Sequence, residues 1–373
     1  MKVLHFYKTY YPESIGGVEQ VIYQIASGVK EHGVVSSVLS LSRGNNSEPV
    51  SIGSHTAHKA KMDFEIASTG FSLSAFSRFK DLASEADIVH YHFPWPFMDL
   101  VHFVSNIQKP TLVTYHSDIV RQALLLQLYR PLMDRFLRSV DRIVATSPNY
   151  VSTSQVLSKH LDKVEVIPIG INKAAYPAPS ADTLALWRDR FGERFFLFVG
   201  VLRYYKGLHI LLEAMKGADY TLVIVGTGPV EQDLKEQALH DGLDNVFFTG
   251  ALPEEDKVAL LQLCYGVTFP SNLRSEAFGI SLLEGAMYGK PMISSEIGTG
   301  TSFINAHDQT GLVVPPGNSA LLRAAMDMLW DNQERAVTMG AQAQARYWEL
   351  FTASRMAQSY ADLYAELLAA KSE

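Results

Sequence analysis

Short apolar runs alternate with segments of helical periodicity along the whole chain. Six such runs, from KVLHFYK near the start to VEVIPIG at Val164, precede a proline-rich stretch, and six more, from FFLFVGV to GLVVPP, follow it. This order is typical of β–α units whose strands form a parallel sheet with helices on its faces. Because the series occurs twice, the sequence predicts an α/β protein with two doubly wound domains.

The stretch YPAPSADT separates the two series. Two prolines within four residues, with small polar neighbours, are typical of a connector between domains. We therefore expect a first domain over residues 1–177 and a second over residues 178–355, since 373 residues exceed what one core usually holds. The helical pattern at 356–373 predicts a terminal helix that either bridges the domains or packs on one of them. Residues 43–71, rich in Gly, Ser, Asn and His, are predicted to form an irregular loop.

The composition limits the classes of function. The formal net charge is −7, with 17 basic and 15 acidic residues up to Ser180 and 15 against 24 beyond it, so no extended basic surface for nucleic acid is expected. The single cysteine, Cys264, excludes an intrachain disulfide, and no Cys/His cluster has structural-zinc spacing. The start of the chain lacks the pattern of a signal peptide, and no membrane-spanning run occurs. These features predict a cytoplasmic protein.

The segment SNLRSEAFGISLLEGAMYGKP carries two glutamates, Glu276 and Glu284, around Phe-Gly-Ile. Ligands of doubly wound sheets bind beyond the carboxyl ends of the strands, and a helix that begins near Gly279 would offer amides to an anion there. We expect Glu276 to accept hydroxyls of a sugar, the amides of Gly279 and Ile280 to bind a diphosphate, and Glu284 to bind a ribose. The alternative is that Glu276 caps a helix and Glu284 is solvated.

The segments EAFGISLLE and GAMYGKPMISS together resemble the E-x7-E signature of retaining glycosyltransferase family 4. The resemblance extends over nearly the whole chain and includes YYPESIGGVEQ, DIVHYHFPW, VTYHSDIV, VATSP, IPIGIN, FVGVLRYYKGL, VIVGTGP and FTGAL. It implies the GT-B fold of two facing Rossmann-like domains, with a terminal helix that crosses back to the first. It also places Phe278 and Ser281 at the donor, and Leu252 with its loop at the base of the nucleotide.

Transfer of a sugar from a nucleotide requires that the departing diphosphate be stabilised, either by a metal ion or by fixed cations. The sequence contains no D-x-D, so we expect no metal and no cofactor, and Arg203 and Lys206 in GVLRYYKG are the expected cations. Lys206 matches the lysine of the family, whereas the usual arginine directly after the glycine is replaced by Val201. Gly16 and Gly17 in SIGGVEQ resemble the family's glycines near the donor phosphate; a tight turn would explain them equally well.

Three residues from the first series are further candidates. His116 and Asp118 in TYHSDIV follow a predicted strand, and His116 looks like the family's histidine that contacts the transferred sugar. Asp118 either positions the acceptor hydroxyl or caps the next helix. His90 and His92 alternate on one strand and so share a face, which favours a structural role, with His92 also a candidate for lining the acceptor site.

The resemblance implies retaining transfer, in which the acceptor hydroxyl attacks on the face from which the diphosphate departs. HFYKTYYP, TYHSDIV and VLRYYKGL look most like bacterial mannosyl- and rhamnosyltransferases of O-antigen synthesis, which implies GDP-mannose or GDP-rhamnose as donor and an undecaprenyl-diphosphate-linked saccharide as acceptor. A UDP-sugar-dependent transferase, a nucleotide-sugar epimerase, a phosphorylase with a pyridoxal phosphate on Lys290, and a non-enzymatic sensor of sugar nucleotides are the alternatives.

The helical segment RQALLLQLYRPLMDRFLRSVDR combines an apolar stripe with arginines on a neighbouring face. Packing on its own domain explains the pattern most simply. Peripheral contact with anionic lipid at the inner face of the cytoplasmic membrane is the second interpretation, because family members with lipid-linked acceptors dock through the first domain.

Overall fold

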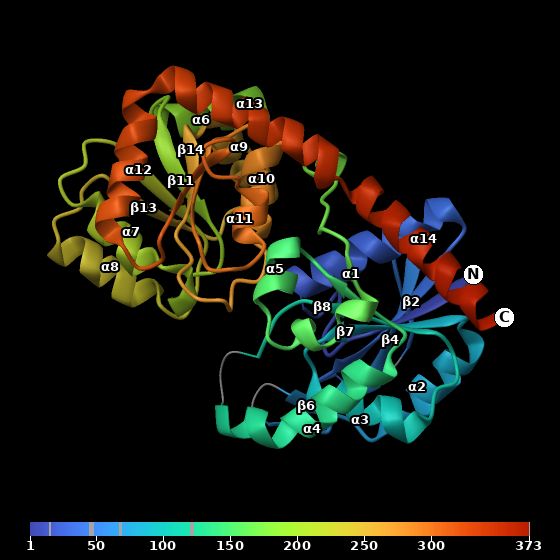
Figure 1. Cartoon of the computed structure of the whole chain (residues 1–373). Helices are drawn as coiled ribbons and strands as arrows, with labels where there is room; N and C mark the ends of the chain where they lie inside the picture. The colour runs from blue at the N-terminus through green and yellow to red at the C-terminus, as the bar shows by residue number, and fades with distance from the viewer. Residues whose placement is uncertain (15, 45–47, 67–68, 120–122, 373) are drawn as a thin grey trace. The chain divides into compact units, whose positions relative to one another are not determined.

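A computed structural model of the chain describes residues 1–14, 16–44, 48–66, 69–119 and 123–372 (Figure 1). The described residues divide into two compact units. The first contains Met1–Ile171 and Ala353–Glu373, and the second contains Asn172–Thr352. The predicted domain boundary lies at residues 177 and 178, within the connector, whereas this division falls after Ile171.

The first unit is built on an eight-stranded sheet in the order β10-β9-β8-β7-β1-β2-β4-β3. All neighbouring strands are parallel except β3, which is antiparallel to β4 at the edge. The strands are β1 (Lys2–Phe6), β2 (Val35–Ser42), β3 (Val50–Ile52), β4 (His55–Lys61), β7 (Ile88–Phe93), β8 (Thr111–Tyr115), β9 (Arg142–Ala145) and β10 (Val164–Val166). A separate short hairpin joins β5 (Phe64–Ile66) to β6 (Thr69–Phe71).

Helices cover both faces of this sheet. They are α1 (Gly17–Gly28), α2 (Ser74–Glu85), α3 (Pro96–Ser105), α4 (Ala123–Ser139), α5 (Pro148–Thr153) and the terminal α14 (Ala353–Ser372), with short 3₁₀ turns at Val29–His32, Leu157–Lys159 and Leu161–Lys163. Phe6 of β1 packs on Phe79 of α2, whereas His90 of β7 bonds to Tyr364 of α14 on the opposite face. Alternation along the strands thus gives each face its own helices.

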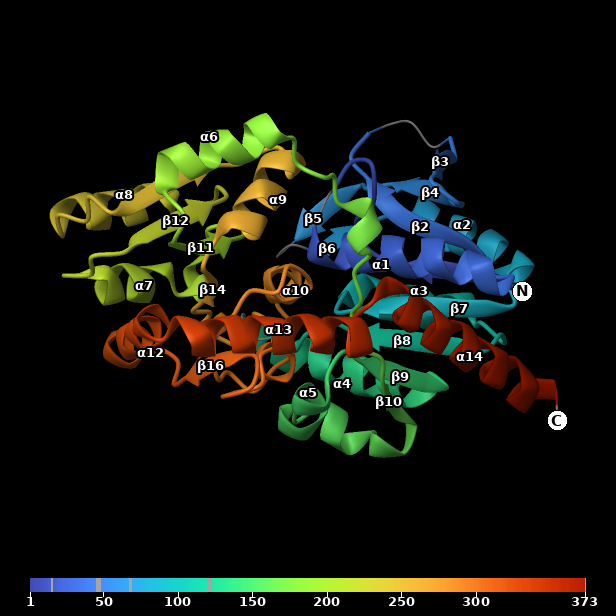
Figure 2. The same cartoon turned by 90° about the horizontal axis from the view of Figure 1, so that it is seen from above.

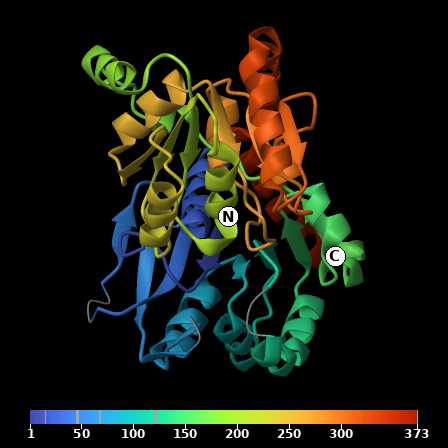
Figure 3. The same cartoon turned by 90° about the vertical axis from the view of Figure 1, so that its left-hand side faces the viewer.

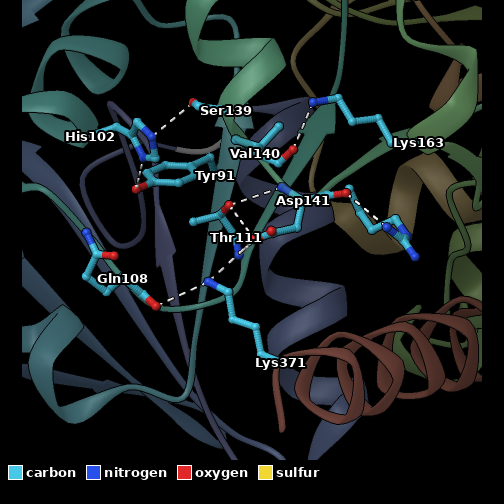
Figure 4. Close-up of polar contacts among 10 residues, drawn as sticks. Tyr91, His102, Gln108, Thr111, Ser139, Val140, Asp141, Lys163 and Lys371 are labelled. Carbon is cyan, nitrogen blue, oxygen red and sulfur yellow. Dashed lines mark hydrogen bonds and ion pairs between the residues drawn. The ribbon is translucent and has the colours of Figure 1, made fainter. Parts of the chain in front are cut away.

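The terminal helix α14 lies beside α1 (Figures 1 and 2). The helices approach closely at Gly28, where an added Cβ would be 2.6 Å from the Cβ of Ala357. Near its end, Lys371 donates a hydrogen bond to the carbonyl of Gln108 at 3.2 Å, within the polar cluster around Asp141 that Figure 4 shows. The last twenty residues therefore complete the first unit, although they follow the second in sequence.

The second unit has a six-stranded, fully parallel sheet in the order β13-β12-β11-β14-β15-β16. Its strands are β11 (Phe195–Val199), β12 (Thr221–Val225), β13 (Val246–Gly250), β14 (Gly266–Phe269), β15 (Met292–Ser295) and β16 (Gly311–Val314). Its helices are α6 (Ala181–Phe191), α7 (Leu208–Met215), α8 (Glu231–His240), α9 (Glu254–Leu263), α10 (Ile280–Met287), α11 (Thr301–Ile304), α12 (Ser319–Asp331) and α13 (Gln333–Leu350), with 3₁₀ turns at Lys173–Ala175 and Tyr204–Lys206.

Two apolar clusters form on opposite faces of this sheet, which has helices on either side (Figure 3). Phe196 and Phe198 of β11 belong to the cluster that α7, α8 and α12 cover. Phe195 and Leu197 belong to the cluster that α6 and α9 cover. A strand that is apolar at every position is what burial on both faces requires.

In each sheet the strand order reverses beside its first strand. The reversal falls between β1 and β7 in the first unit and between β11 and β14 in the second. In doubly wound sheets, ligands bind beyond the carboxyl ends of the strands at this switch point. The loops that follow these four strands are therefore where a functional site is expected.

All twelve predicted strands are present, but the prediction for residues 43–71 is wrong. β4 pairs with β2 from Thr56 to Lys61. Its core residues are Ala57 and Ala60, between polar Thr, His and Lys, so the apolar pattern is weak even though the strand lies inside the sheet. Among the described residues, no helix has both the length and the apolar character needed to cross a bilayer.

Candidate active site

Lys206 and Glu276 form an ion pair at the switch point of the second sheet. The Nζ of Lys206, in the loop after β11, lies 2.5 Å from Oε2 of Glu276, in the loop after β14, and both side chains are only about one-tenth exposed. Lys206 also lies over the ring of Phe269 at 4.8 Å. Two residues 70 positions apart in sequence are thus joined at the place where the strand order reverses.

Gly207 allows these two loops to approach. Its φ of +69° is in the left-handed region, and an added Cβ would lie 2.0 Å from the carbonyl oxygen of Pro270. The amide of Asn272 donates to the carbonyl of Tyr205 at 3.0 Å, which ties the loops together. A side chain at Gly207 would separate Lys206 from the loop of Glu276.

Helix α10 begins directly after Gly279, as the sequence predicts. Gly279 has a φ of +102°, and the hydroxyl of Ser281 donates to the carbonyl of Val199 at 2.7 Å, so the helix end is fixed against the end of β11. Phe278 is buried and Ile280 half-buried. The first amides of a helix have no partner within it and can bind an anion.

Glu284 is buried and paired, so the alternative of a solvated side chain is wrong. Its Oε1 accepts from Lys257 of α9 at 2.8 Å and from the hydroxyl of Tyr176 at 3.0 Å. Lys257 also contacts Glu254 at 2.7 Å. Burial lowers the pKa of Lys257, but the two carboxylates raise it by more, so Lys257 is charged at neutral pH.

Arg203 and Leu252 lie at the same edge of the sheet, on the loops after β11 and β13, with β12 between these two strands. Arg203 is exposed and lines a 240 Å³ hollow with residues of α7 and α8. Leu252 follows β13 and is half-buried. The loops after β11 and β12 approach closely, since an added Cβ on Gly226 would lie 2.0 Å from the carbonyl of Gly200, and the amide of Gly226 donates to the carbonyl of Gly250 at the end of β13 at 2.9 Å. The structure therefore places the predicted donor residues of the second unit at one edge of the sheet, on α10 and on three loops, with Arg203 and Lys206 after β11, Leu252 after β13 and Glu276 after β14.

The loop after β1 leads into α1 through Gly16, its N-cap, and Gly17, its first residue. The buried Glu19 accepts hydrogen bonds from the hydroxyls of Thr9 at 2.8 Å and Ser14 at 2.7 Å. Glu19 thus connects the loop after β1 to the first turn of α1. The sequence analysis did not identify this role. The carboxylate two residues after the glycine pair in GGVE is a signal that could have suggested it.

A chain of buried histidines crosses the switch point of the first sheet. His116, directly after β8, lies 3.0 Å from His92 between Nε2 and Nδ1, and His92 lies 3.1 Å from His5 between Nε2 and Nδ1. Burial lowers the pKa of His5 and of His116 to about 3, and burial together with neighbouring histidines lowers that of His92 well below its ordinary value. All three are therefore neutral at pH 7.

His90 lies against this chain and has separate partners. Its two ring nitrogens bond to Tyr364 and Thr114, each at 2.7 Å. The nitrogens of His5, His90 and His92 lie within 4.8 Å of one another, which is close enough for a metal site. However, a metal ion would have to displace both partners of a buried histidine, and no carboxylate belongs to this group to offset its charge.

Asp118 bonds to protein groups of its own unit. Its Oδ1 accepts from the hydroxyls of Tyr115 and Ser154, each at 2.8 Å, and its amide donates to the hydroxyl of Tyr150 at 2.6 Å. It thus connects the loop after β8 to α5 and the turn that follows. The predicted alternative, a cap on the next helix, concerns the start of α4, and residues 120–122 before that helix lie outside the described residues.

Comparison with known proteins agrees with this geometry. The model of Glycosyltransferase Family 4 matches residues 15–175, and that of Glycosyl transferases group 1 matches residues 188–346. The D-rhamnosyltransferase WbpZ of Pseudomonas aeruginosa is 61% identical over 95% of this chain and 93% of its own. The chain belongs to glycosyltransferase family 4. The O-antigen chain mannosyltransferase C of Escherichia coli is 51% identical over the full length of both chains.

Solved structures show the same fold. The sucrose-phosphate synthase of Thermosynechococcus elongatus superposes with a TM-score of 0.81 at 20% identity, covering 99% of each chain. WaaG, a glycosyltransferase involved in lipopolysaccharide biosynthesis, superposes with a TM-score of 0.72 at 17% identity, covering 97% of this chain and 99% of its own. These structures confirm the predicted GT-B fold, and the two close relatives confirm the predicted glycosyltransferase activity.

Proposed function

We propose that this glycosyltransferase transfers mannose or D-rhamnose from a GDP-sugar, with retention, to a saccharide in O-antigen synthesis. The observation that carries the proposal is the Lys206–Glu276 pair at the second switch point, directly before the amino end of α10. The full-length similarity to a D-rhamnosyltransferase and to an O-antigen mannosyltransferase supports the choice of sugar and pathway.

The charges of the pair suit a donor with a diphosphate and a sugar. In the unliganded protein Lys206 neutralises Glu276. A diphosphate bound at the first amides of α10 would draw the ammonium of Lys206 towards itself, and Glu276 could then accept hydroxyls of the sugar. Arg203, exposed on the same loop, would supply a second cation. Fixed cations then stabilise the leaving diphosphate without a metal ion or cofactor.

The remaining roles follow from position. Glu284, already held by Lys257 and Tyr176, would accept the ribose hydroxyls, and Leu252 would contact the base. Gly16 and Gly17 would approach the donor phosphate, and His116 the transferred sugar. The side chains of His92 and Asp118 already form hydrogen bonds within the protein. We therefore propose that the acceptor saccharide binds to surface residues near them and does not contact these two side chains directly.

Contact with anionic lipid would bring the enzyme to an undecaprenyl-diphosphate-linked acceptor at the inner face of the cytoplasmic membrane. On α4, Phe136 is buried, but Leu128 is 80% exposed and Leu125 49% exposed, and Arg135, two turns after Leu128 on the same face, is exposed as well. An exposed leucine among arginines is what peripheral contact with an anionic bilayer requires.

The donor is tested by thermal shift with GDP-, UDP-, ADP- and TDP-sugars, followed by turnover of the best donor with lipid-linked saccharides. Stabilisation by GDP-mannose or GDP-rhamnose together with acceptor-dependent release of GDP supports the proposal. Preference for a UDP-sugar, or release of sugar or epimerised donor without acceptor, contradicts it.

Membrane contact is tested by sedimentation with anionic vesicles. Leu128→Glu should reduce binding, whereas Leu239→Glu, which changes an 84% exposed leucine of the second unit, should not.

A further inference from the structure

The histidine chain of the first unit joins His116 to two further buried imidazoles, those of His92 and His5. His5 stands on β1, His92 on β7 and His116 directly after β8, on three consecutive strands of the sheet. His5 is opposite His90 in the register, and His92 is two residues further along the same face. The rings of His92 and His116 are stacked, with centroids 5.3 Å apart. All three side chains are buried.

Neutral imidazoles in such a chain have linked tautomers. Each ring carries one N–H and one lone pair, and His92 uses both of its nitrogens, one towards His116 and one towards His5. If His92 donates at Nδ1, it must accept at Nε2, and the protons of all three rings lie on Nδ1. If it donates at Nε2, all three protons lie on Nε2. The proton position of one ring therefore fixes the others.

The end of the chain decides between these two states. The Nε2 of His5 is buried and has no hydrogen-bond partner in the part of the chain that the structure describes. A proton there would be a buried donor without an acceptor, which is rarer and costlier than an unpaired lone pair. The state with protons on Nδ1 leaves only a lone pair at His5. It also makes the Nδ1 of His116 a hydrogen-bond donor.

The geometry points to His92 and His5 as positioning residues that fix the tautomer of His116, so that its Nδ1–H is offered to a hydroxyl or ring oxygen of the transferred sugar. The inference rests on the proposed contact of His116 with that sugar. A neutral donor suits glycosyl transfer, because the transition state carries positive charge on the sugar ring and a charged imidazolium beside it would be unfavourable.

A purely structural role of His92 is the alternative, and a double-mutant cycle separates the two. His92→Phe keeps a ring but removes both nitrogens, and we expect it to lower kcat about tenfold with little change in KM for the donor. His116→Ala should lower kcat at least as much. If His92 acts through His116, the double variant should be no slower than His116→Ala alone. Independent, multiplying losses would overturn the inference.

Rescue gives a second readout. His92→Asn retains an amide that can donate to Nε2 of His116, whereas the ionised carboxylate of His92→Asp can only accept there and would force the proton onto Nε2. We expect Asn to restore most of the activity and Asp not to restore it. In ¹⁵N-histidine spectra of the wild type, His116 should carry its proton on Nδ1. A proton on Nε2, or equal rescue by Asp, would overturn the assignment.

His102, which bonds to Tyr91 on the opposite face of β7, serves as a control for the general effect of substituting a buried histidine. His102 is buried and bonds to Tyr91 at 2.9 Å and to Ser139 at 3.1 Å, as Figure 4 shows. His102→Phe should leave kcat within about twofold of the wild type at matched folding, measured by urea unfolding. A loss equal to that of His92→Phe would mean that any buried histidine gives the effect. Wild-type protein without turnover, or a fully active His116→Ala, would instead refute the proposed function.

Discussion

In both sheets the strand order reverses beside the first strand, but the side chains near that point differ. In the first unit, neutral imidazoles meet there, with His92 between His5 and His116. In the second unit, an ammonium group meets each carboxylate, Lys206 at Glu276 and Lys257 at Glu284. The same position in one topology therefore holds two kinds of polar site.

The difference shows how a buried polar group keeps or loses its charge. The causes that lower the pKa of His5, His92 and His116 are burial and other histidines, with no carboxylate among them. These rings gain more from hydrogen bonds in the neutral form. Lys257 is half-buried but stays charged, because Glu284 and Glu254 lie within hydrogen-bond distance. A site that must bind diphosphate needs the second arrangement, and a site that must not repel an oxocarbenium-like sugar suits the first.

The largest effect is expected at the charged switch point. Glu276→Ala should lower kcat about a hundredfold or more, because a polar group aimed at the reacting sugar is lost, while the affinity for nucleotide falls only modestly. Turnover and nucleotide titration measure the two quantities separately. Lys235→Ala, which breaks an exposed ion pair with Glu231 on α8, is the matched control and should change neither. A loss of nucleotide affinity as large as the loss of kcat would contradict the role of Glu276.

Gly207 tests whether close approach of two loops maintains the pair. Gly217 has the same φ of +69° but open space around a Cβ, whereas a Cβ on Gly207 would meet the carbonyl of Pro270. Gly217→Ala should therefore cost about 1–2 kcal/mol for its backbone conformation alone. Gly207→Ala should cost more than this in urea unfolding, and it alone should weaken donor binding. Equal costs for the two variants would show that the clash is relieved.

Glu284 tests whether a buried pair can also serve as a ligand. Glu284→Gln keeps an oxygen that accepts from Tyr176, and Lys257 keeps its ion pair with Glu254. The free energy of unfolding should therefore fall by only about 1 kcal/mol. Nucleotide affinity should fall about tenfold, because a charged acceptor for the ribose hydroxyls becomes neutral. Calorimetric titration with GDP measures this affinity. Unchanged affinity would mean that Glu284 only supports the fold.

A further prediction concerns the acid sensitivity of the first unit. Unfolded histidine binds its proton near pH 6.5, whereas His5 and His116 in the folded protein do so only near pH 3. Between these values the unfolded chain binds more protons, so the free energy of unfolding falls as the pH is lowered, by up to about 1.4 kcal/mol per pH unit for each histidine. Urea unfolding between pH 7 and pH 5 measures the slope.

The matched variants for that slope are His5→Phe and His32→Phe. His5→Phe removes one buried group that cannot easily take up a proton, so the slope should become shallower. His32 is exposed, and its substitution should leave the slope unchanged. Equal slopes for the wild type and His5→Phe would show that the buried chain does not contribute to acid sensitivity.

The sequence by itself determined the fold class and where the proposed donor residues lie relative to the strands and helices. Strand and helix periods are local properties, so the twelve apolar runs were enough to predict two parallel sheets. The spacing of Glu276, Gly279 and Glu284 likewise determined that one glutamate precedes α10 and the other lies within it. Strand β4 was missed because its two buried alanines are separated by polar residues, and only pairing with β2 makes it a strand.

Only the tertiary structure decided the charge states and partners of these residues. His5 and His92 are 87 positions apart, and Glu284 and Tyr176 are 108 apart, so no local pattern could indicate their hydrogen bonds. Nor could the sequence decide between a bridging and a packed terminal helix, which the close contact of Gly28 with Ala357 places on α1. The physical reason is common to all three: burial and the nearest opposite charge are set by the packing of distant segments, and they determine whether a polar side chain is ionised, neutral or a ligand.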